Sequence, residues 1–125
     1  MYIIRLKSSY IKFIIPQIVL FSCIASCKRV KFEKSKWNYY DDSMFPPSSR
    51  PLMLNDLVTT HKLVGLRYSE LIKLIGKPDG EQDNLISYDI AVKYSGVDPD
   101  YTKSLKFVYS KDSLITSFKI VEWED

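Results

Sequence analysis

The chain has 125 residues, of which 46% are hydrophobic and 26% charged, a composition typical of one globular domain with an additional short segment. Of its 18 basic residues, Arg5, Lys7 and Lys12 account for the net charge of +3, because the other 15 are balanced by the 15 acidic residues. A nucleic-acid partner is therefore excluded from our expectations, since phosphate contacts need a basic face in the mature protein.

Residues 1–26 are predicted to be a lipoprotein signal peptide. They combine a basic start, an apolar run over 13–21 and two small residues before Cys27. The alternative is a membrane-spanning helix, which needs about 20 predominantly apolar residues. Because Pro16 and Gln17 interrupt an already short run, the sequence favours an export signal.

The tetrapeptide Ile24-Ala25-Ser26-Cys27 resembles the lipobox of bacterial lipoproteins. The resemblance implies cleavage before Cys27 and attachment of diacylglycerol to its thiol, so that a lipidated Cys27 begins the mature protein. Small residues at this point let the peptidase fit the chain beside a membrane-embedded lipid. The competing register, Leu20-Phe21-Ser22-Cys23, would place a bulky phenylalanine beside the cleaved bond.

The two cysteines of the chain, Cys23 and Cys27, have a second interpretation as a disulfide, because exported proteins meet an oxidising compartment. A loop this short would stabilise no folded structure. If cleavage precedes Cys27, Cys23 is removed and the one remaining thiol is bound to lipid. Thiol catalysis, cysteine metal sites and structural disulfides are then all excluded.

Residues 27–50 are predicted to be a lipid-anchored tether that is first basic and then proline-rich. Two or three acyl chains anchor a protein stably, and the segment 28–36 adds five basic residues against one glutamate. This segment either interacts with anionic headgroups or remains a solvated linker. The aromatic residues after it, Trp37 among them, either lie at the membrane interface or pack on the domain. Pro46-Pro47 disfavours helix and strand, so we expect the compact domain over 51–125.

Two short helices are predicted at the start of this domain. Pro51 suits a first helical turn, and an apolar face follows it, made of Leu54, Leu57, Val58 and His61. The second helix is expected over 68–75, where Leu71, Leu74 and Ile75 recur at helical spacing. Gly76 offers a left-handed C-cap, and Pro78 prevents continuation.

The apolar pattern then changes to a period of two, which is typical of strands. Three strands are predicted, in the segments 86–94, 104–110 and 113–123, with a hairpin turn over 110–113. The residues expected to face one side are Ile86, Tyr88, Ile90, Val92, Tyr94, Leu105, Phe107, Tyr109, Leu114, Thr116, Phe118 and Ile120. Because this face must be covered, we expect a two-layer α+β sandwich with two N-terminal helices on a three-stranded antiparallel meander (ααβββ).

Residues with catalytic or metal-binding chemistry are few. His61 is the only histidine, and its spacing places it on the apolar side of the first helix, where we expect a packed or half-exposed side chain rather than a catalytic one. Asp98 and Asp100 could bind a hard cation, but Asp-Pro-Asp is more typical of turns. The four glycines are scattered and form no phosphate-binding loop. We therefore expect no enzyme activity, catalytic residue, metal or cofactor.

The motif Leu63-Val64-Gly65-Leu66, Glu70-Leu71, Leu74-Ile75-Gly76-Lys77-Pro78 resembles the signature of the SmpA/OmlA, or BamE-like, lipoproteins. The resemblance implies a small helix-helix-strand-strand-strand domain tethered to the outer membrane, with a fold like the repeats of β-lactamase inhibitor proteins. Arg67 stands where that family usually has a serine or threonine N-cap, so either Ser69 caps a shorter helix or the helix begins uncapped.

The expected function is that of a non-enzymatic envelope protein that binds another protein, as outer-membrane assembly lipoproteins do. Because Lys28 is not the aspartate that retains enterobacterial lipoproteins in the inner membrane, we expect the outer membrane, with the domain facing the periplasm. One alternative is an inhibitor of a secreted enzyme that uses the outer sheet face and the loop 95–102. The other is a lipoprotein that binds lipid or a small ligand. Cys27 is the one assigned site residue, and partner-binding residues are left open.

Overall fold

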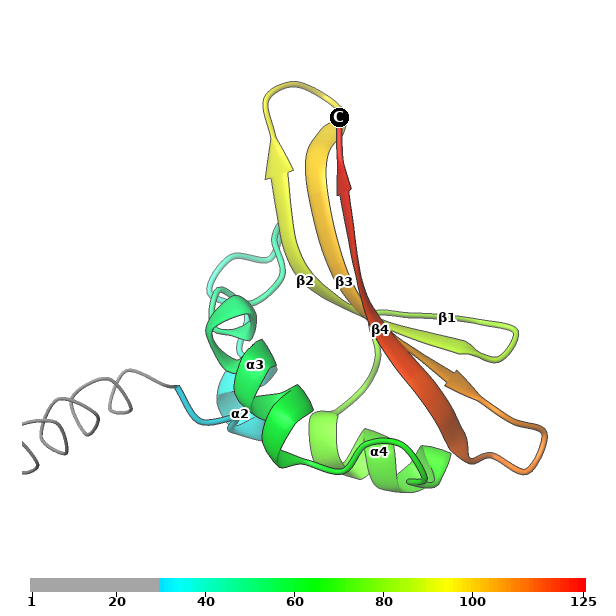
Figure 1. Cartoon of the computed structure of the whole chain (residues 1–125). Helices are drawn as coiled ribbons and strands as arrows, with labels where there is room; N and C mark the ends of the chain where they lie inside the picture. The colour runs from blue at the N-terminus through cyan, green and yellow to red at the C-terminus, as the bar shows by residue number, and fades with distance from the viewer. Residues whose placement is uncertain (1–29) are drawn as a thin grey trace, which may run out of the picture.

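The computed structural model describes residues 30–125, so the signal peptide and Cys27 lie outside the described residues. This part of the chain is an α+β structure, as predicted, and Figure 1 shows the helices gathered on one side of a bent sheet. Its elements are α2 (Lys34–Trp37), α3 (Arg50–Thr60), α4 (Tyr68–Ile75), β1 (Gly80–Gln82), β2 (Leu85–Tyr94), β3 (Pro99–Tyr109) and β4 (Ile115–Glu124). Among residues 30–125, no helix has the length and apolar character to cross a membrane.

The sheet is antiparallel with the strand order β1-β2-β3-β4. The predicted meander corresponds to β2, β3 and β4, and the two predicted helices correspond to α3 and α4. The prediction matches only roughly, because the short helix α2 and the three-residue strand β1 were not expected. Neither element is long enough to show a period in the sequence, since helical and strand patterns need several repeats.

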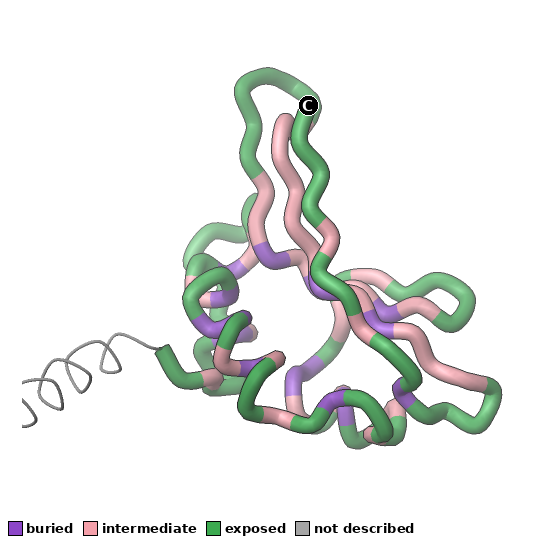
Figure 2. Tube along the Cα trace, viewed as in Figure 1, coloured by how far each residue is buried: buried purple, intermediate pink, exposed green. Residues whose placement is uncertain are grey.

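The core lies between the helices and the middle of the sheet, where Figure 2 shows the buried positions. The alternation predicted for β2 and β3 is confirmed where the helices cover these strands, because five of the expected residues are buried. These residues are Ile86, Tyr88, Ile90, Leu105 and Phe107. Along β4 the prediction differs, since a register shift pairs Tyr109 with Ile115 but Val108 with Ser117. Ile115 is therefore buried in place of its neighbours Leu114 and Thr116.

The N-terminal segment packs on the domain from Phe32 onward, which differs from the expected tether over 27–50. Trp37 is completely buried, and the Phe32 backbone N–H donates to the Asp56 carboxylate at 2.8 Å. The Asn38 side-chain amide donates to the carbonyl of Ile75 at 2.7 Å. Of the two fates considered for Trp37, packing on the domain is the one observed. The compact unit therefore begins about twenty residues before Pro51, because tertiary contacts order a segment that has no periodic pattern.

Helix α4 coincides with the predicted range, and the structure answers the question of its start. The Glu70 carboxylate reaches back and accepts the backbone N–H of Arg67 at 2.9 Å, which is half of a capping box. At the other end Gly76 has a φ of +113°, and a Cβ there would lie 2.6 Å from the Asn38 amide nitrogen. Glycine is therefore needed both for its backbone conformation and for the close approach of Asn38.

Candidate functional site

Arg50 is a buried cation that joins the N-terminal segment to the sheet. It is only 1% exposed, and its Nε–H donates to the carbonyl of Trp37 at 3.0 Å. Its Nη1 donates to the Asp79 carboxylate at 2.5 Å and to the Asp89 carbonyl at 2.8 Å. The segment before α3, the loop before β1 and strand β2 are thus held together by one guanidinium. This role was not predicted from the sequence, because Arg50 stands at the end of a polar, proline-rich stretch.

Two aromatic rings complete the surroundings of Arg50. Its guanidinium carbon lies 5.3 Å from the Trp37 ring centroid and 5.7 Å from that of Tyr40. The Tyr40 hydroxyl donates to the Asp79 carboxylate at 2.8 Å, and burial followed by that carboxylate raises the pKa of Tyr40. The cluster Asn38, Tyr40, Arg50, Lys77, Pro78 and Asp79 lines a shallow pocket. Arg50 and Asp79 are paired with each other, and the contacts of Tyr40 with both connect the loop over residues 39–48 to this ion pair.

That loop and the β2–β3 turn together form an exposed apolar surface, which we call the tip surface and define as Met44, Phe45, Tyr94 and Val97. Met44 is 80% and Val97 96% exposed, and the four side chains line an open groove with Gly96. The rings of Phe45 and Tyr94 meet edge to face at 5.9 Å. Two segments about fifty residues apart in the chain therefore meet where β2 leaves the helices (Figure 1).

Acidic residues flank the tip surface. Asp42 accepts the Met44 backbone N–H at 3.0 Å, and Asp41 accepts that of Ser48 at 3.2 Å. The hydrogen bonds from Ser48 lower the pKa of Asp41, so its carboxylate stays ionised at a lower pH than an ordinary aspartate does. Asp98 follows Val97 directly and is also exposed. The charged residues nearest to the tip surface in the chain are thus two exposed acids, Asp42 and Asp98, and one exposed base, Lys93.

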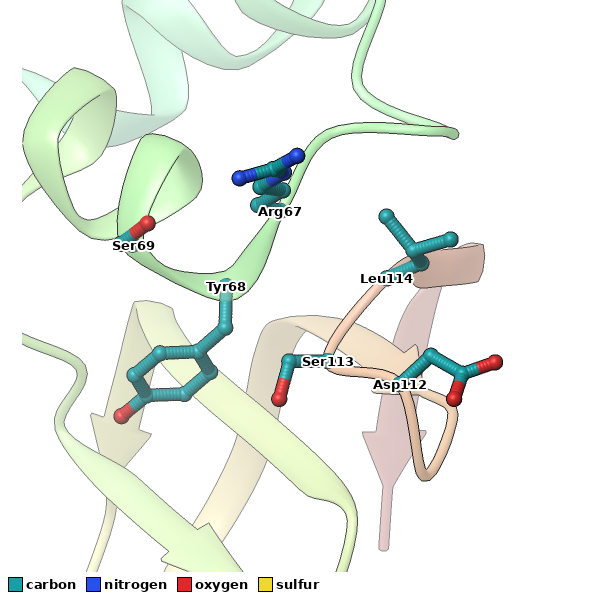
Figure 3. A pocket seen from close by; sticks show the side chains of 6 residues that line it. All are labelled: Arg67, Tyr68, Ser69, Asp112, Ser113 and Leu114. Carbon is teal, nitrogen blue, oxygen red and sulfur yellow. The ribbon is translucent and has the colours of Figure 1, made fainter.

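A second groove lies between the start of α4 and the β3–β4 turn, and it is lined by Arg67, Tyr68, Ser69, Asp112, Ser113 and Leu114. Backbone pairing builds it, because Tyr68 N–H donates to the Ser113 carbonyl at 2.8 Å. Figure 3 shows that the polar side chains around the groove point in different directions. They do not converge on one point, so the groove offers no set of ligands for a bound molecule.

The candidate residues from the sequence are placed as follows. His61 ends α3, where its ring lies 5.7 Å from that of Phe32 and its Nδ1 lies 3.0 Å from the Thr60 hydroxyl. Asp98 is the last residue of the β2–β3 turn and Asp100 lies in β3, so the loop expected over 95–102 is shortened to 95–98. Within residues 30–125, no group of three or more His, Cys, Asp or Glu side chains is arranged to hold a metal ion.

Comparison with known proteins does not extend this description. Neither a protein-family model, nor a curated protein, nor a solved structure matches the chain. The tip surface therefore has to be interpreted from its own geometry. Val97 lies in the loop of the inhibitor hypothesis, whereas no role was expected for Met44 or Phe45. The loop that carries these two residues is connected through Tyr40 to the ion pair of Arg50 and Asp79, which no local pattern reveals.

Proposed function

We propose that the protein is a non-enzymatic lipoprotein of the bacterial outer membrane, facing the periplasm, whose domain binds another protein through the tip surface. The observation that carries the proposal is the gathering of four exposed apolar side chains from two distant segments. Single exposed apolar residues are common on protein surfaces, but contiguous patches mark interaction sites. The lipobox at Ile24–Cys27 and the BamE-like motif support the membrane and family parts of the proposal.

The tip surface is suited to binding because it is ordered before any partner arrives. Tyr40 connects the loop to Asp79 and lies against the Arg50 guanidinium, and the hydrogen bonds of Asp41 and Asp42 brace the loop internally. Association costs free energy when loops and side chains must be ordered, by about 0.5 to 1.5 kcal/mol for each flexible side chain. A pre-ordered loop avoids part of that cost.

The charges around the tip surface define the kind of partner. Asp42 and Asp98 outnumber Lys93 beside the tip surface and favour a protein that carries an apolar side chain with neighbouring basic residues, because complementary charges select partners and accelerate association. A membrane surface is a poorer match, since its anionic headgroups would be repelled by the same carboxylates. The densest run of basic residues in the chain instead lies over 28–36, directly after the proposed lipid anchor.

Inhibition of a secreted enzyme is the second candidate. The observation that favours it is the projecting β2–β3 turn, which presents Val97 with 96% of its surface exposed. A turn of this shape could enter the cleft of a hydrolase. The two candidates share the tip surface and differ in whether the partner is an envelope assembly component or a soluble hydrolase.

The proposal is tested by crosslinking in envelope membranes, followed by mass spectrometry of what is captured. The double variant Met44→Asp, Val97→Asp should lose the captured partner, whereas Leu52→Asp should keep it, because Leu52 is 63% exposed on α3 outside the tip surface. Capture of barrel-assembly components supports the accessory function, and capture of one soluble hydrolase supports inhibition. Equal capture by the double variant and the wild type would exclude the tip surface.

The anchor is tested separately with Cys27→Ala. We expect this variant to leave the outer-membrane fraction while keeping the fold of residues 30–125, because the residue lies before the packed segment. If the variant still fractionates with outer membranes, the lipid assignment is wrong.

A further inference from the structure

Strand β4 is an open edge of the sheet that carries apolar side chains. The strand order ends at β4, which pairs with β3 on one side only. Ile120 is 42% and Trp123 49% exposed, and Phe118 and Val121 are half-buried. A long apolar edge of this kind is a template for another strand, and most proteins protect theirs with charges, prolines or covering loops. The charged residues of β4 are Lys119, Glu122 and Glu124, and they restrict the registers that an added strand can adopt.

The first residues of this edge are already used for pairing. Ile115 N–H donates to the Leu66 carbonyl, and Gly65 N–H donates to the Ile115 carbonyl, each at 2.8 Å. Arg67 and Leu114 form an isolated antiparallel bridge beside them. This cover ends at Ile115, and within residues 30–125 no further strand lies along 117–124. The geometry of the edge therefore permits pairing, and most of its length is available.

The register between β3 and β4 shows which face of the sheet each side chain of β4 occupies. Phe118 and Ile120 lie opposite the buried residues Phe107 and Leu105, so they point to the face that the helices cover. Side chains alternate between the faces along a strand, so three residues of β4 point to the uncovered face. They are Lys119, Val121 and Trp123.

We propose that a second copy of this chain pairs antiparallel with β4, across a two-fold axis at Ile120 or Val121. A two-fold axis perpendicular to the sheet keeps each residue on its own face, so opposed residues must share a face. Only registers centred on a residue meet this condition. Centring on Lys119 or Glu122 would bring like charges directly together, which is unfavourable. Centring on Trp123 would likewise oppose Glu122 to Glu124, and centring on Phe118 or an earlier residue would set part of β4 opposite Ile115, which is already paired. Ile120 and Val121 are the centres that remain.

Both remaining registers give favourable cross-strand pairs. Centring on Val121 places Lys119 opposite Trp123 twice, a cation–π pairing on the uncovered face. Centring on Ile120 brings the two isoleucines together and sets Lys119 opposite Val121. Neither register opposes two charges of the same sign, and neither overlaps the part of the edge that Leu66 covers. The proposal is independent of the tip surface, which involves other residues.

The first test is disulfide crosslinking of the full chain carrying Ile120→Cys or Val121→Cys. Directly opposed residues of an antiparallel pair have Cα atoms about 4.5 to 5.5 Å apart, which permits a disulfide. We expect oxidation to give covalent dimers from the variant at the axis. Ser95→Cys, an exposed residue distant from β4, serves as the control in the same background. If both axis variants give no more dimer than the control, the proposal is overturned.

The second test measures mass in solution by analytical ultracentrifugation over a dilution series. We expect a concentration-dependent dimer for the wild type and a monomer for the double variant Ile120→Lys, Val121→Lys, with an unchanged thermal melt. Leu52→Lys should remain dimeric, because it adds a similar charge away from the edge. A wild type that is monomeric at every concentration overturns the proposal, even if the edge accepts a strand from another protein.

Discussion

The two halves of the sheet contrast in what lies beneath them. In the covered half, which holds Ile86, Tyr88, Leu105 and Phe107, these side chains have 0% of their surface exposed. In the projecting half, which runs from Ala91 through the β2–β3 turn, apolar side chains remain in solvent. The alternating pattern of β2 continues across both halves, so it cannot distinguish them. Alternation alone therefore does not imply burial, because burial depends on how far the helices extend.

The boundary between the halves is a register shift in β2. The pairing with β3 shifts between Asp89 and Ala91, which bends the strand as bulges do. Tyr88, just before the shift, donates its hydroxyl to the Gly76 carbonyl at 2.7 Å, and burial raises its pKa. Below the boundary the sheet contributes stability, and beyond it the same strands present the surface proposed for recognition.

The largest expected effect lies in the covered half. Phe107→Ala should lower the free energy of unfolding by about 3 to 5 kcal/mol, because it leaves a cavity among closely packed rings. Phe118→Ala should cost clearly less, since Phe118 lies half-exposed on the edge strand. Urea denaturation of both variants measures the difference. Equal losses would mean that the edge strand is as well covered as the centre of the sheet.

The next effect lies where the two halves meet. Arg50→Ala should lower the free energy of unfolding by about 3 kcal/mol, because it leaves the largely buried Asp79 carboxylate without its counter-ion. The variant Asp79→Asn and the double variant complete a mutant cycle. The expected result is that the double variant costs less than the sum of the two single variants. Strict additivity would show that the ion pair does not hold the N-terminal segment.

A small effect on stability is expected in the projecting half. The double variant Met44→Ser, Val97→Ser should change the free energy of unfolding by no more than about 0.5 kcal/mol, because both side chains are already in solvent. Thermal melts and circular dichroism would measure this. A loss comparable to that of Phe107→Ala would abolish the contrast between the halves.

The smallest effect concerns Asp89, which lies at the boundary. Burial, followed by repulsion from Asp79, raises the pKa of Asp89. An acid with a raised pKa in the folded state favours folding when protonated, and that advantage is lost as the pH rises through its pKa. Asp89→Asn should therefore raise stability at neutral pH, by at most about 0.5 kcal/mol, and leave it unchanged below the ordinary pKa of about 4. Urea denaturation from about pH 3 to pH 7 would measure this. A variant that is less stable than the wild type at neutral pH would contradict the raised pKa of Asp89.

Most of the regular elements could be predicted from the sequence because their patterns are local. The range of α4 follows from its apolar spacing and Gly76, and the turn over 110–113 lies between two alternating segments. By contrast, α2 spans four residues and β1 three, so that neither is long enough for its pattern to repeat twice. The burial of Trp37 depends on α3 and Tyr88, which are distant in the chain.

The candidate site was harder to predict than the fold for a related reason. Arg50 is charged and follows two prolines and two serines, so its sequence context indicates solvent. Only the folded chain supplies Asp79 and the carbonyls of Trp37 and Asp89 around it. The exposure of Met44 and Val97 is likewise a property of the surroundings, because the same residue types are buried elsewhere in this chain or in β-sheets generally.

The packing of Phe32 also limits how far the proposed lipoprotein could act from its membrane. Five backbone steps separate Cys27 from Phe32, which at full extension span at most about 18 Å. A free tether from Cys27 to Pro51 would instead allow roughly 80 Å. If Cys27 carries the lipid, the domain works in a thin layer next to the bilayer. Its partner would then have to be a protein that comes to the membrane surface or already resides there.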